Sequence, residues 1–512
     1  MKRSIRKVAV LGSGVMGSRI ACHFAGIGVQ ALLLDIVPKE ATESKDAKAR
    51  NKIVNDSLTA AIKSNPSPVY HKDVVKKITT GNFDDNMKDI AGCDWIIEVV
   101  VERLDIKQKV FEQVEKYRKP GTLITSNTSG IPIHLMAEGR SDDFKKHFCG
   151  THFFNPPRYL RLLEIIPTPF TDPEIVDFLL HYGDLFLGKT TVLCKDTPAF
   201  IANRIGVYGI MSLFGLVDKM GLTIDEVDAL TGPIIGRPKS ATFRTADVVG
   251  IDTLVKVAKG VYDNCPADEA REEFVTPAWL NKIVENNWLG DKTGQGFFKK
   301  MPGASKGEKE IHVLDLKTLE YVPRKKPKFA TIEAAKPIDD LNLRLKMLCS
   351  GQDKAGEFYR LFHYGLFAYI SHRIPEISDE LYRVDDAMMA GFGWEIGAFE
   401  SWDTLGVAKT TEAMKAAGYK VAAWVDEMIA AGNKSFYKIE NGKRLCYDPA
   451  SKTYKILPGA DSFIIMSNYQ EKLVWKNGSC RLHDLGDDVL GLQWFTKMGS
   501  IGGDVLSGIQ TS

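Results

Sequence analysis

The chain has 512 residues, of which 44% are hydrophobic and 26% charged, a composition that suits two to four globular domains with substantial cores. The 67 Lys and Arg residues nearly balance the 65 Asp and Glu residues, so the net charge of +2 provides no broad basic field for nucleic acid. No segment approaches the ~18 consecutive apolar residues of a membrane span. The eight cysteines stand far apart with no CxxC pair, which predicts buried thiols in a reducing compartment, no metal site and a cytoplasmic location.

A glycine pattern follows the first apolar run of the chain. Residues 8–11 predict a buried strand, and the glycines after it allow a tight turn that brings a pyrophosphate close to a helix N-terminus. Asp35 ends the next apolar run, at the place of a ribose-hydroxyl acceptor, and its carboxylate would repel a 2′-phosphate. We therefore predict that NAD, rather than NADP, is bound by Gly12, Gly14, Met16, Gly17 and Asp35.

Beyond this unit, strands and helices alternate as a parallel sheet requires. The pattern predicts strands over 94–101 and 122–126 and helices over 18–28, 41–65 and 104–116.

Two pairs of polar residues in this region are candidates for ligand binding. Glu102 and Lys107 follow a predicted strand, near the carboxyl ends where ligands bind in open α/β sheets, so both are predicted cofactor neighbours. Ser57 and Lys63 lie on the polar helix 41–65, which could hold an anionic, nucleotide-like substrate tail. The alternative for that helix is a solvated charged face.

His152 precedes two phenylalanines and an Asn-Pro-Pro turn, at the predicted end of a strand. The following apolar run, 160–166, brings Glu164 back alongside it. A neutral imidazole with a carboxylate partner suits removal of a proton from a secondary alcohol. A histidine satisfied within the core is the alternative.

A new helical region begins after residue 195. The sequence predicts a loop followed by a helix that starts at Pro198. Asn203 on this helix and Ser129 on the sheet side would face one cleft, although each could instead be a cap or a turn residue.

Five ordered motifs together resemble the 3-hydroxyacyl-CoA dehydrogenases over about residues 5–300: 12–17, 126–129, 152–156, Glu164 and 196–204. The resemblance implies an NAD-binding α/β Rossmann domain followed by an all-helical C-terminal domain. It also implies oxidation of 3-hydroxyacyl-CoA to 3-ketoacyl-CoA in fatty-acid β-oxidation, by hydride transfer to NAD.

The resemblance further implies roles for individual residues. His152 is the acid/base and Glu164 its partner, while Ser129 and Asn203 hydrogen-bond the reacting oxygen and the thioester; Asn127 and Asn155 lie near the cofactor. Gly130 departs from the pattern, because many relatives carry a second serine there. A dehydrogenase of free β-hydroxy acids and a non-catalytic scaffold are the alternative functions.

The helical region contains an internal repeat. Arg204 and Arg360, and likewise Asp247 and Asp403, stand 156 residues apart. This predicts a duplicated all-helical domain at 355–437 without catalytic residues, because Tyr359 stands at the offset of Asn203. The resemblance implies that in single-copy members the helical domain pairs with its twin in a dimer. A duplicated chain can make that contact within itself, which predicts a mostly monomeric dehydrogenase unit. Alternatively, the copy lines an acyl pocket with Trp394, Phe399 and Trp402.

We therefore expect five regions: a Rossmann domain at 1–197, a helical domain at 198–300, an exposed linker with a short hairpin at 301–354, the duplicated helical domain at 355–437, and a final linker and tail at 438–512. The tail resembles the opening strands and first helix of an enoyl-CoA hydratase (crotonase-like) domain. We expect it to be ordered only as a hairpin against the second helical copy and to give no hydratase activity. A hydratase or a thiolase is the expected protein partner.

Overall fold

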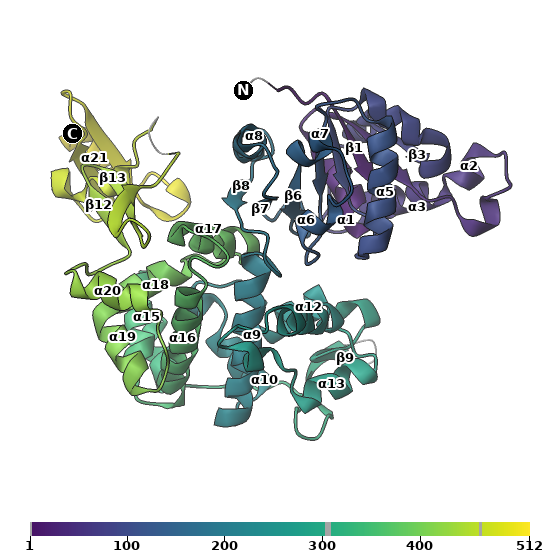
Figure 1. Cartoon of the computed structure of the whole chain (residues 1–512). Coiled ribbons are helices and arrows are strands. Elements are labelled where there is room, and N and C mark those ends of the chain that lie inside the picture. The colour runs from purple at the N-terminus through teal and green to yellow at the C-terminus, as the bar shows by residue number, and fades with distance from the viewer. Residues whose placement is uncertain (1–2, 303–308, 460–462) are drawn as a thin grey trace. The chain divides into compact units, whose positions relative to one another are not determined.

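The computed structural model of the chain describes residues 3–302, 309–459 and 463–512. The chain divides into two compact units, each described below by itself (Figure 1). The first unit contains residues 1–405 and 409–422, and the second contains 406–408 and 423–512.

An eight-stranded sheet forms the first part of the larger unit, in the order β3-β2-β1-β4-β5-β6-β7-β8. The strands are β1 (Lys7–Leu11), β2 (Gln30–Asp35), β3 (Ile78–Asn82), β4 (Trp95–Glu98), β5 (Leu123–Ser126), β6 (Phe148–Phe153), β7 (Leu162–Pro167) and β8 (Thr190–Leu193). Strands β1 to β6 pair in parallel, β7 runs antiparallel to β6, and β8 is parallel to β7. The chain places β2 and β3 on one side of β1 and then crosses to place β4 on the other side. Open α/β sheets bind ligands at such a switch point, at the carboxyl ends of the strands. This sheet confirms the predicted Rossmann-like fold.

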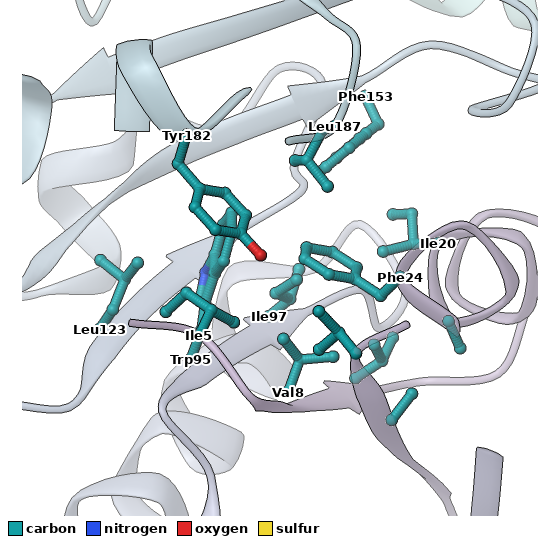
Figure 2. Close-up of a cluster of buried hydrophobic side chains, with 14 of the residues drawn as sticks. Ile5, Val8, Ile20, Phe24, Trp95, Ile97, Leu123, Phe153, Tyr182 and Leu187 are labelled. Carbon is teal, nitrogen blue, oxygen red and sulfur yellow. The ribbon is translucent and has the colours of Figure 1, made fainter. Parts of the chain in front are cut away.

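Helices cover both faces of the sheet. They are α1 (Val15–Gly26), α2 (Ala47–Arg50), α3 (Lys52–Lys63), α4 (Phe83–Asn86), α5 (Leu104–Tyr117), α6 (Ile133–Met136), α7 (Asp142–Lys146) and α8 (Pro173–Leu185). On one face, Trp95 of β4 meets Phe24 of α1 edge-on at 5.3 Å between ring centroids, and Tyr182 of α8 at 6.0 Å (Figure 2). On the other face, Phe111 of α5 packs edge-on against Phe144 of α7 at 5.6 Å. A sheet buried on both faces explains its nearly continuous apolar strands.

The helix predicted over 41–65 is interrupted in the structure, because tertiary hydrogen bonds end its first part. Arg50 at the end of α2 binds Asp85 through Nε at 2.7 Å, and Asn82 donates to Asn51 Oδ1 at 2.7 Å. Only α3 continues to Lys63. The first helix also begins at Val15, directly after the glycine turn, rather than at Ser18.

The helical domain follows β8. Its helices are α9 (Ala202–Met220), α10 (Ile224–Leu230), α11 (Phe243–Val249), α12 (Ile251–Asn264) and α13 (Ala278–Glu285). Asp228 of α10 accepts hydrogen bonds from the main-chain N–H of Phe243 and Arg244 and so caps the start of α11.

Residues 301–354 differ from the predicted exposed linker, although 303–308 lie outside the described residues. Strands β9 (Phe298–Pro302), β10 (Lys309–Leu314) and β11 (Tyr321–Pro323) form a three-stranded antiparallel sheet rather than a single hairpin. Two helices follow, α14 (Ala330–Ala335) and α15 (Leu341–Ser350), and Leu345 and Leu348 of α15 are buried. The Lys- and Pro-rich composition concealed this apolar helix face.

More helices follow in the larger unit: α16 (Lys354–His372), α17 (Leu381–Phe392), α18 (Ala398–Leu405) and, from its third residue on, α19 (Val407–Ala416). Strand β8 and helix α17 lie in contact, as do α9 and α16. Trp402 and Phe399 are fully buried, and Trp402 stacks on Phe367 of α16 at 5.1 Å. These two aromatic residues therefore belong to the core of this region.

The second unit contains α20 (Ala423–Ala430) and two antiparallel three-stranded sheets. The first sheet is built from β12 (Tyr437–Glu440), β13 (Lys443–Asp448) and β14 (Thr453–Ile456). The second is built from β15 (Leu473–Lys476), β16 (Cys480–Asp484) and β17 (Leu490–Trp494), with α21 (Gly503–Thr511) after it. The prediction of a hairpin alone was wrong, because β15 adds a third strand and α21 buries Val505.

Two further observations concern the described residues as a whole. None of their helices combines the length and the apolar composition needed to cross a membrane. All eight cysteines are described, seven of them are buried, and no disulfide joins any of them.

Candidate active site

The glycine turn after β1 is shaped by two close backbone approaches. Gly12 has φ +105°, and a β-carbon on it would lie 2.6 Å from the carbonyl oxygen of Val99. A β-carbon on Gly17 would lie 1.8 Å from the carbonyl oxygen of Gly12. A β-carbon on Gly14, by contrast, would have no tertiary neighbour within 4 Å among the described residues. The turn therefore exposes its backbone at Gly14, which is the surface that a pyrophosphate requires. Met16, on the first turn of α1, is partly buried against the core of the sheet.

Asp35 lies at the end of β2, beside this turn. Its Oδ2 accepts hydrogen bonds from the main-chain N–H of Ser13 at 2.6 Å and from Ser13 Oγ at 2.5 Å. The structure thus brings the predicted ribose acceptor next to the predicted phosphate turn. Ser13, which sequence reasoning did not select, fixes the carboxylate there.

A buried ion pair lies at the end of β4. The ammonium group of Lys107 is 2.8 Å from Glu98 Oε1 and 3.4 Å from Glu102 Oε2, and both the Lys107 and Glu98 side chains are almost completely buried. Ser126 Oγ also donates to Glu98. Burial raises the pKa of Glu98, and the Lys107 charge opposes that rise. Lys107 is therefore a buried support for the two glutamates rather than an exposed group.

Glu102 organises the loop after β5. Its Oε1 accepts from Thr128 Oγ1 at 2.6 Å and from the main-chain N–H groups of Ser129 and Gly130, each at 3.0 Å. Partial burial alone would raise the pKa of Glu102, but the Lys107 charge and these hydrogen bonds outweigh burial and hold it below its ordinary value. The hydroxyl of Ser129 is thereby held on a defined turn.

The two predicted asparagines occupy different settings. Asn127 joins neighbouring strands, because its N–H donates to the carbonyl of Glu98 at 2.8 Å and its Oδ1 accepts from the N–H of Phe153 at 2.9 Å. Asn155 is exposed in the loop after β6.

His152 and Glu164 are directly opposite each other in the antiparallel pair β6–β7. His152 Nδ1 lies 2.7 Å from Glu164 Oε2. His152 is 6% exposed and Glu164 is fully buried. An ionised carboxylate only accepts hydrogen bonds, so Nδ1 carries the proton and Nε2 is the basic nitrogen.

The second carboxylate oxygen of Glu164 reaches the helical domain. It accepts from the main-chain N–H groups of Ile201 at 3.1 Å and Ala202 at 2.8 Å. The preceding residues, Ala199 and Phe200, have φ of +63° and +50°, and the ring of Phe200 lies 5.7 Å from the ring of His152. The prediction of a helix starting at Pro198 was therefore wrong, because residues 198–201 form a turn and α9 starts at Ala202.

The remaining candidates are not joined to this cluster by hydrogen bonds. Asn203 stands one residue into α9 and makes no side-chain hydrogen bond to any residue that the structure describes. Ser57 is half-buried and Lys63 exposed on α3. Their six-residue spacing directs them about 120° apart around the helix. Their binding of a substrate tail stays a prediction.

Lys189 is a further polar residue that sequence reasoning missed. It is 3% exposed, and its ammonium group donates to the carbonyls of Pro157 and Leu160, the latter at 2.8 Å. Burial lowers its pKa to about 8. The available signal was a lysine within an otherwise uncharged stretch, 185–194. Lys189 secures the loop that carries Asn155.

The glycine turn, the acidic end of β2 and the His–Glu pair held by the first helix of a second domain define a two-domain, nucleotide-binding dehydrogenase. The family profile described as "3-hydroxyacyl-CoA dehydrogenase, NAD binding domain" matches residues 7–197, and the profile of the C-terminal domain matches residues 200–300. The chain belongs to the 3-hydroxyacyl-CoA dehydrogenase family, and residues 7–197 are its NAD-binding domain.

Individual relatives agree with this assignment. A probable 3-hydroxyacyl-CoA dehydrogenase of Bacillus subtilis is 44% identical over 99% of this chain and 64% of its own length. A probable 3-hydroxyacyl-CoA dehydrogenase of Deinococcus radiodurans is 45% identical over 58% of this chain and 83% of its own length. The solved 3-hydroxybutyryl-CoA dehydrogenase of Escherichia coli shares the fold, with a TM-score of 0.59 and 19% identity over 84% of this chain and 99% of that chain. The chain thus spans less than two thirds of the Bacillus relative.

The glycine turn gives a paired prediction. Gly17→Ala should lower thermal stability even without NAD, because its methyl group would meet backbone. Gly14→Ala should keep the stability of the unliganded protein but weaken NADH binding by about tenfold or more, equivalent to about 1.4 kcal/mol. Thermal unfolding and NADH fluorescence titration measure the two effects. Unchanged NADH affinity in Gly14→Ala would show that the pyrophosphate lies elsewhere.

Lys189 should make stability depend on pH. Its pKa is about 8 in the folded protein against an ordinary value of 10.5, so the unfolded chain binds more protons between these values. Stability should therefore rise with pH across this window, by up to about 3 kcal/mol. Lys189→Met should remove that rise, which urea unfolding between about pH 8 and about pH 10 would measure. Equal pH dependence in the two proteins would contradict the prediction.

Proposed function

We propose that this chain oxidises 3-hydroxyacyl-CoA thioesters to 3-ketoacyl-CoA, as a step of fatty-acid oxidation. The observation that carries the proposal is the buried His152–Glu164 pair, with its 2.7 Å Nδ1–Oε2 contact, in the sheet of the NAD-binding domain. A fixed tautomer and a basic Nε2 are what removal of a hydroxyl proton requires. Both relatives are named as probable 3-hydroxyacyl-CoA dehydrogenases, which supports the same substrate class.

In the proposed reaction, His152 Nε2 removes the proton of the C3 hydroxyl while the C3–O bond becomes a carbonyl. NAD, when bound, supplies the acceptor for the hydride that leaves C3. Glu164 holds the ring and faces the imidazolium that forms. We assign hydrogen bonding of the reacting oxygen and the thioester to Ser129 and Asn203. The reverse reaction uses the same groups.

For the cofactor, we propose that Gly12, Gly14 and Gly17 surround the pyrophosphate and that Asp35 accepts from the ribose. Met16, Glu102, Asn127 and Asn155 are proposed as further neighbours. Lys107 acts indirectly in this proposal, because its ammonium group is buried against Glu98 and Glu102. The cytoplasmic location and a hydratase or thiolase partner stay predictions.

We further propose that the region 355–437 is a second copy of the helical domain. In support, α9 and α16 both span 19 residues. Asp385 accepts from the N–H groups of Phe399 and Glu400, just as Asp228 accepts from those of Phe243 and Arg244. Tyr359, at the offset of Asn203, is buried and donates to the carbonyl of Leu230 at 2.9 Å.

Substitution of the proposed base tests the reaction. His152→Gln should leave NADH affinity unchanged while turnover of acetoacetyl-CoA falls by at least ~100-fold, since a positioned general base contributes ~10²- to 10⁴-fold. Steady-state kinetics and an NADH titration give both quantities. Free acetoacetate, assayed alongside with the unaltered chain, should be the poorer substrate. Near-normal turnover in His152→Gln, or a preference for acetoacetate, would refute this function.

The second copy predicts the oligomeric state. Pairing of α9 with α16 inside one chain should leave a mostly monomeric protein with one active site. Tyr208 of α9 already stacks on Tyr369 of α16 with 3.7 Å between ring centroids. Sedimentation velocity should therefore show a monomer at micromolar concentration. A tight dimer built through residues 200–300 would be incompatible with the proposal.

A further inference from the structure

The segment Lys195–Arg204 connects the sheet to α9 and touches the proposed active site at both ends. At its start, the Asp196 carboxylate accepts from the N–H groups of Ile133 at 2.8 Å and His134 at 2.9 Å. These two residues open α6, directly after the loop that carries Ser129. Asp196 therefore ties the segment to the Ser129 side of the site.

Near its end, the same segment holds the catalytic pair. Ile201 and Ala202 donate their N–H groups to Glu164, and Phe200 places its ring against His152. Ala199 and Phe200 adopt left-handed backbone conformations, which non-glycine residues rarely adopt unless surrounding contacts impose them.

The α16–α17 connection, residues 373–380, supplies such contacts to the start of the segment. The main-chain N–H of Lys195 donates to the carbonyl of Ile377 at 3.0 Å. The ammonium group of Lys195 donates to the carbonyl of Pro375 and to Asp379 Oδ1, each at 2.6 Å. All three groups that accept hydrogen bonds from Lys195 belong to this one connection.

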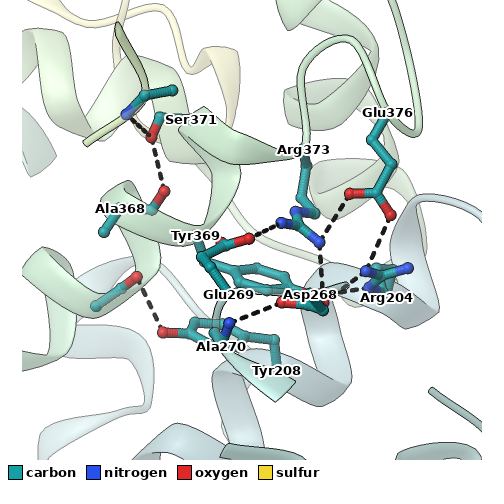
Figure 3. A network of polar contacts seen from close by, with 12 residues as sticks. Arg204, Tyr208, Asp268, Glu269, Ala270, Ala368, Tyr369, Ser371, Arg373 and Glu376 are labelled. Atoms are coloured by element: carbon teal, nitrogen blue, oxygen red, sulfur yellow. Dashed lines mark hydrogen bonds and ion pairs between the residues drawn. The ribbon is translucent and has the colours of Figure 1, made fainter. Parts of the chain in front are cut away.

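At the end of the segment, Arg204 contacts the same connection through Glu376 (Figure 3). Its guanidinium group is fully buried and lies 3.0 Å from Glu376 and 2.5 Å from Asp268. Its Nε donates to the hydroxyl of Tyr369 at 2.6 Å, and its Nη1 lies 3.5 Å from the carbonyl oxygen of Pro198, at the start of the turn.

A second arginine, at the first position of the α16–α17 connection, belongs to the same cluster. Arg373 is 2% exposed and lies 2.9 Å from Asp268 and 2.8 Å from Glu376. Glu376 thus bridges two buried guanidinium groups, one from each helical region, while its own side chain remains 37% exposed. A change at Glu376 therefore alters the cluster from its solvent side.

We propose that the α16–α17 connection positions the His152–Glu164 pair through the segment Lys195–Arg204, with Lys195 and Glu376 as positioning residues. This inference rests on the function proposed above. The proposed second copy of the helical domain, for which we predict no catalytic residues, then contributes to the reaction. It does so by fixing the turn whose N–H groups hold Glu164. Neither positioning residue touches the reacting atoms.

Three variants and one control test the proposal in the full chain. Lys195→Met removes the contacts to Pro375 and Asp379, and Lys195→Arg keeps the positive charge. Glu376→Gln removes the charge that bridges Arg204 and Arg373. The control, Glu333→Gln, makes the same chemical change at an exposed residue of α14. Glu333 pairs locally, with Lys336 three residues further on.

Lys195→Met and Glu376→Gln should lower kcat for acetoacetyl-CoA by about 10- to 100-fold, because small displacements of catalytic groups cost that much. KM for NADH should change by less than about twofold, since the glycine turn and Asp35 are untouched. Lys195→Arg should restore most of kcat, and Glu333→Gln should behave like the unaltered chain. If kcat and Tm are both unchanged in Lys195→Met and in Glu376→Gln, the proposal is overturned.

Hydrogen exchange provides a readout that does not depend on activity. In Lys195→Met and Glu376→Gln, the amides of Ile201 and Ala202 should exchange faster, while those of β1 should not change. Faster exchange with normal kcat would overturn the proposal. If the unaltered chain proves inactive, the proposed function fails by itself, and exchange still decides whether the connection fixes the turn: unchanged exchange would refute it.

Discussion

The burial of one carboxylate, that of Glu164, links the two domains of the dehydrogenase unit. An ionised carboxylate moved from water into a protein interior costs several kcal/mol unless it is paired and hydrogen-bonded. Here one oxygen faces the imidazole of His152, and the other accepts two main-chain N–H groups at the start of α9. Because these donors come from the helical domain, the charge is compensated only when that domain lies against the sheet. The same contact that orients the proposed base therefore also favours domain docking.

A second buried carboxylate, Glu98, is compensated in a different way. Its partner is the full positive charge of Lys107, with a hydroxyl donor from Ser126. The pair carries no net charge. Lys107 also lies 3.4 Å from Glu102, which in turn holds the loop that carries Ser129. Glu164, in contrast, is held by neutral main-chain donors, so no positive charge among the described residues offsets the carboxylate beside the ring that we propose takes up the proton. Two buried acids on strands of the same sheet thus have different surroundings because their donors differ.

The features predicted from sequence are those encoded within one short stretch. The glycine turn, Asp35 and the antiparallel neighbours His152 and Glu164 all depend on local spacing, and the sheet aligns them as that spacing indicates. Glu98 was missed because it lies inside an apolar run, so we counted it as part of the predicted strand rather than as a candidate polar residue. The start of α9 was misplaced because Glu164, 38 residues before Ala202, determines which residue begins the helix. Helix α15 was missed because the Lys- and Pro-rich residues before it favoured a single exposed linker, although Leu, Met and Cys make up most of the helix itself.

The buried charges between α9 and α16 are better explained by specificity than by stability. Isosteric apolar residues often stabilise such a contact as well as buried ion pairs do, since desolvation offsets much of the attraction. The stacked rings of Tyr208 and Tyr369 already provide apolar contact, but flat rings tolerate sliding along the helix axes. A guanidinium group has fixed donor directions and tolerates little displacement from its acceptors. Arg204 and Arg373 share Asp268 and Glu376, so only one register of the two helices satisfies both groups. That register also sets the position of the turn before α9, and therefore of the two N–H groups that hold Glu164.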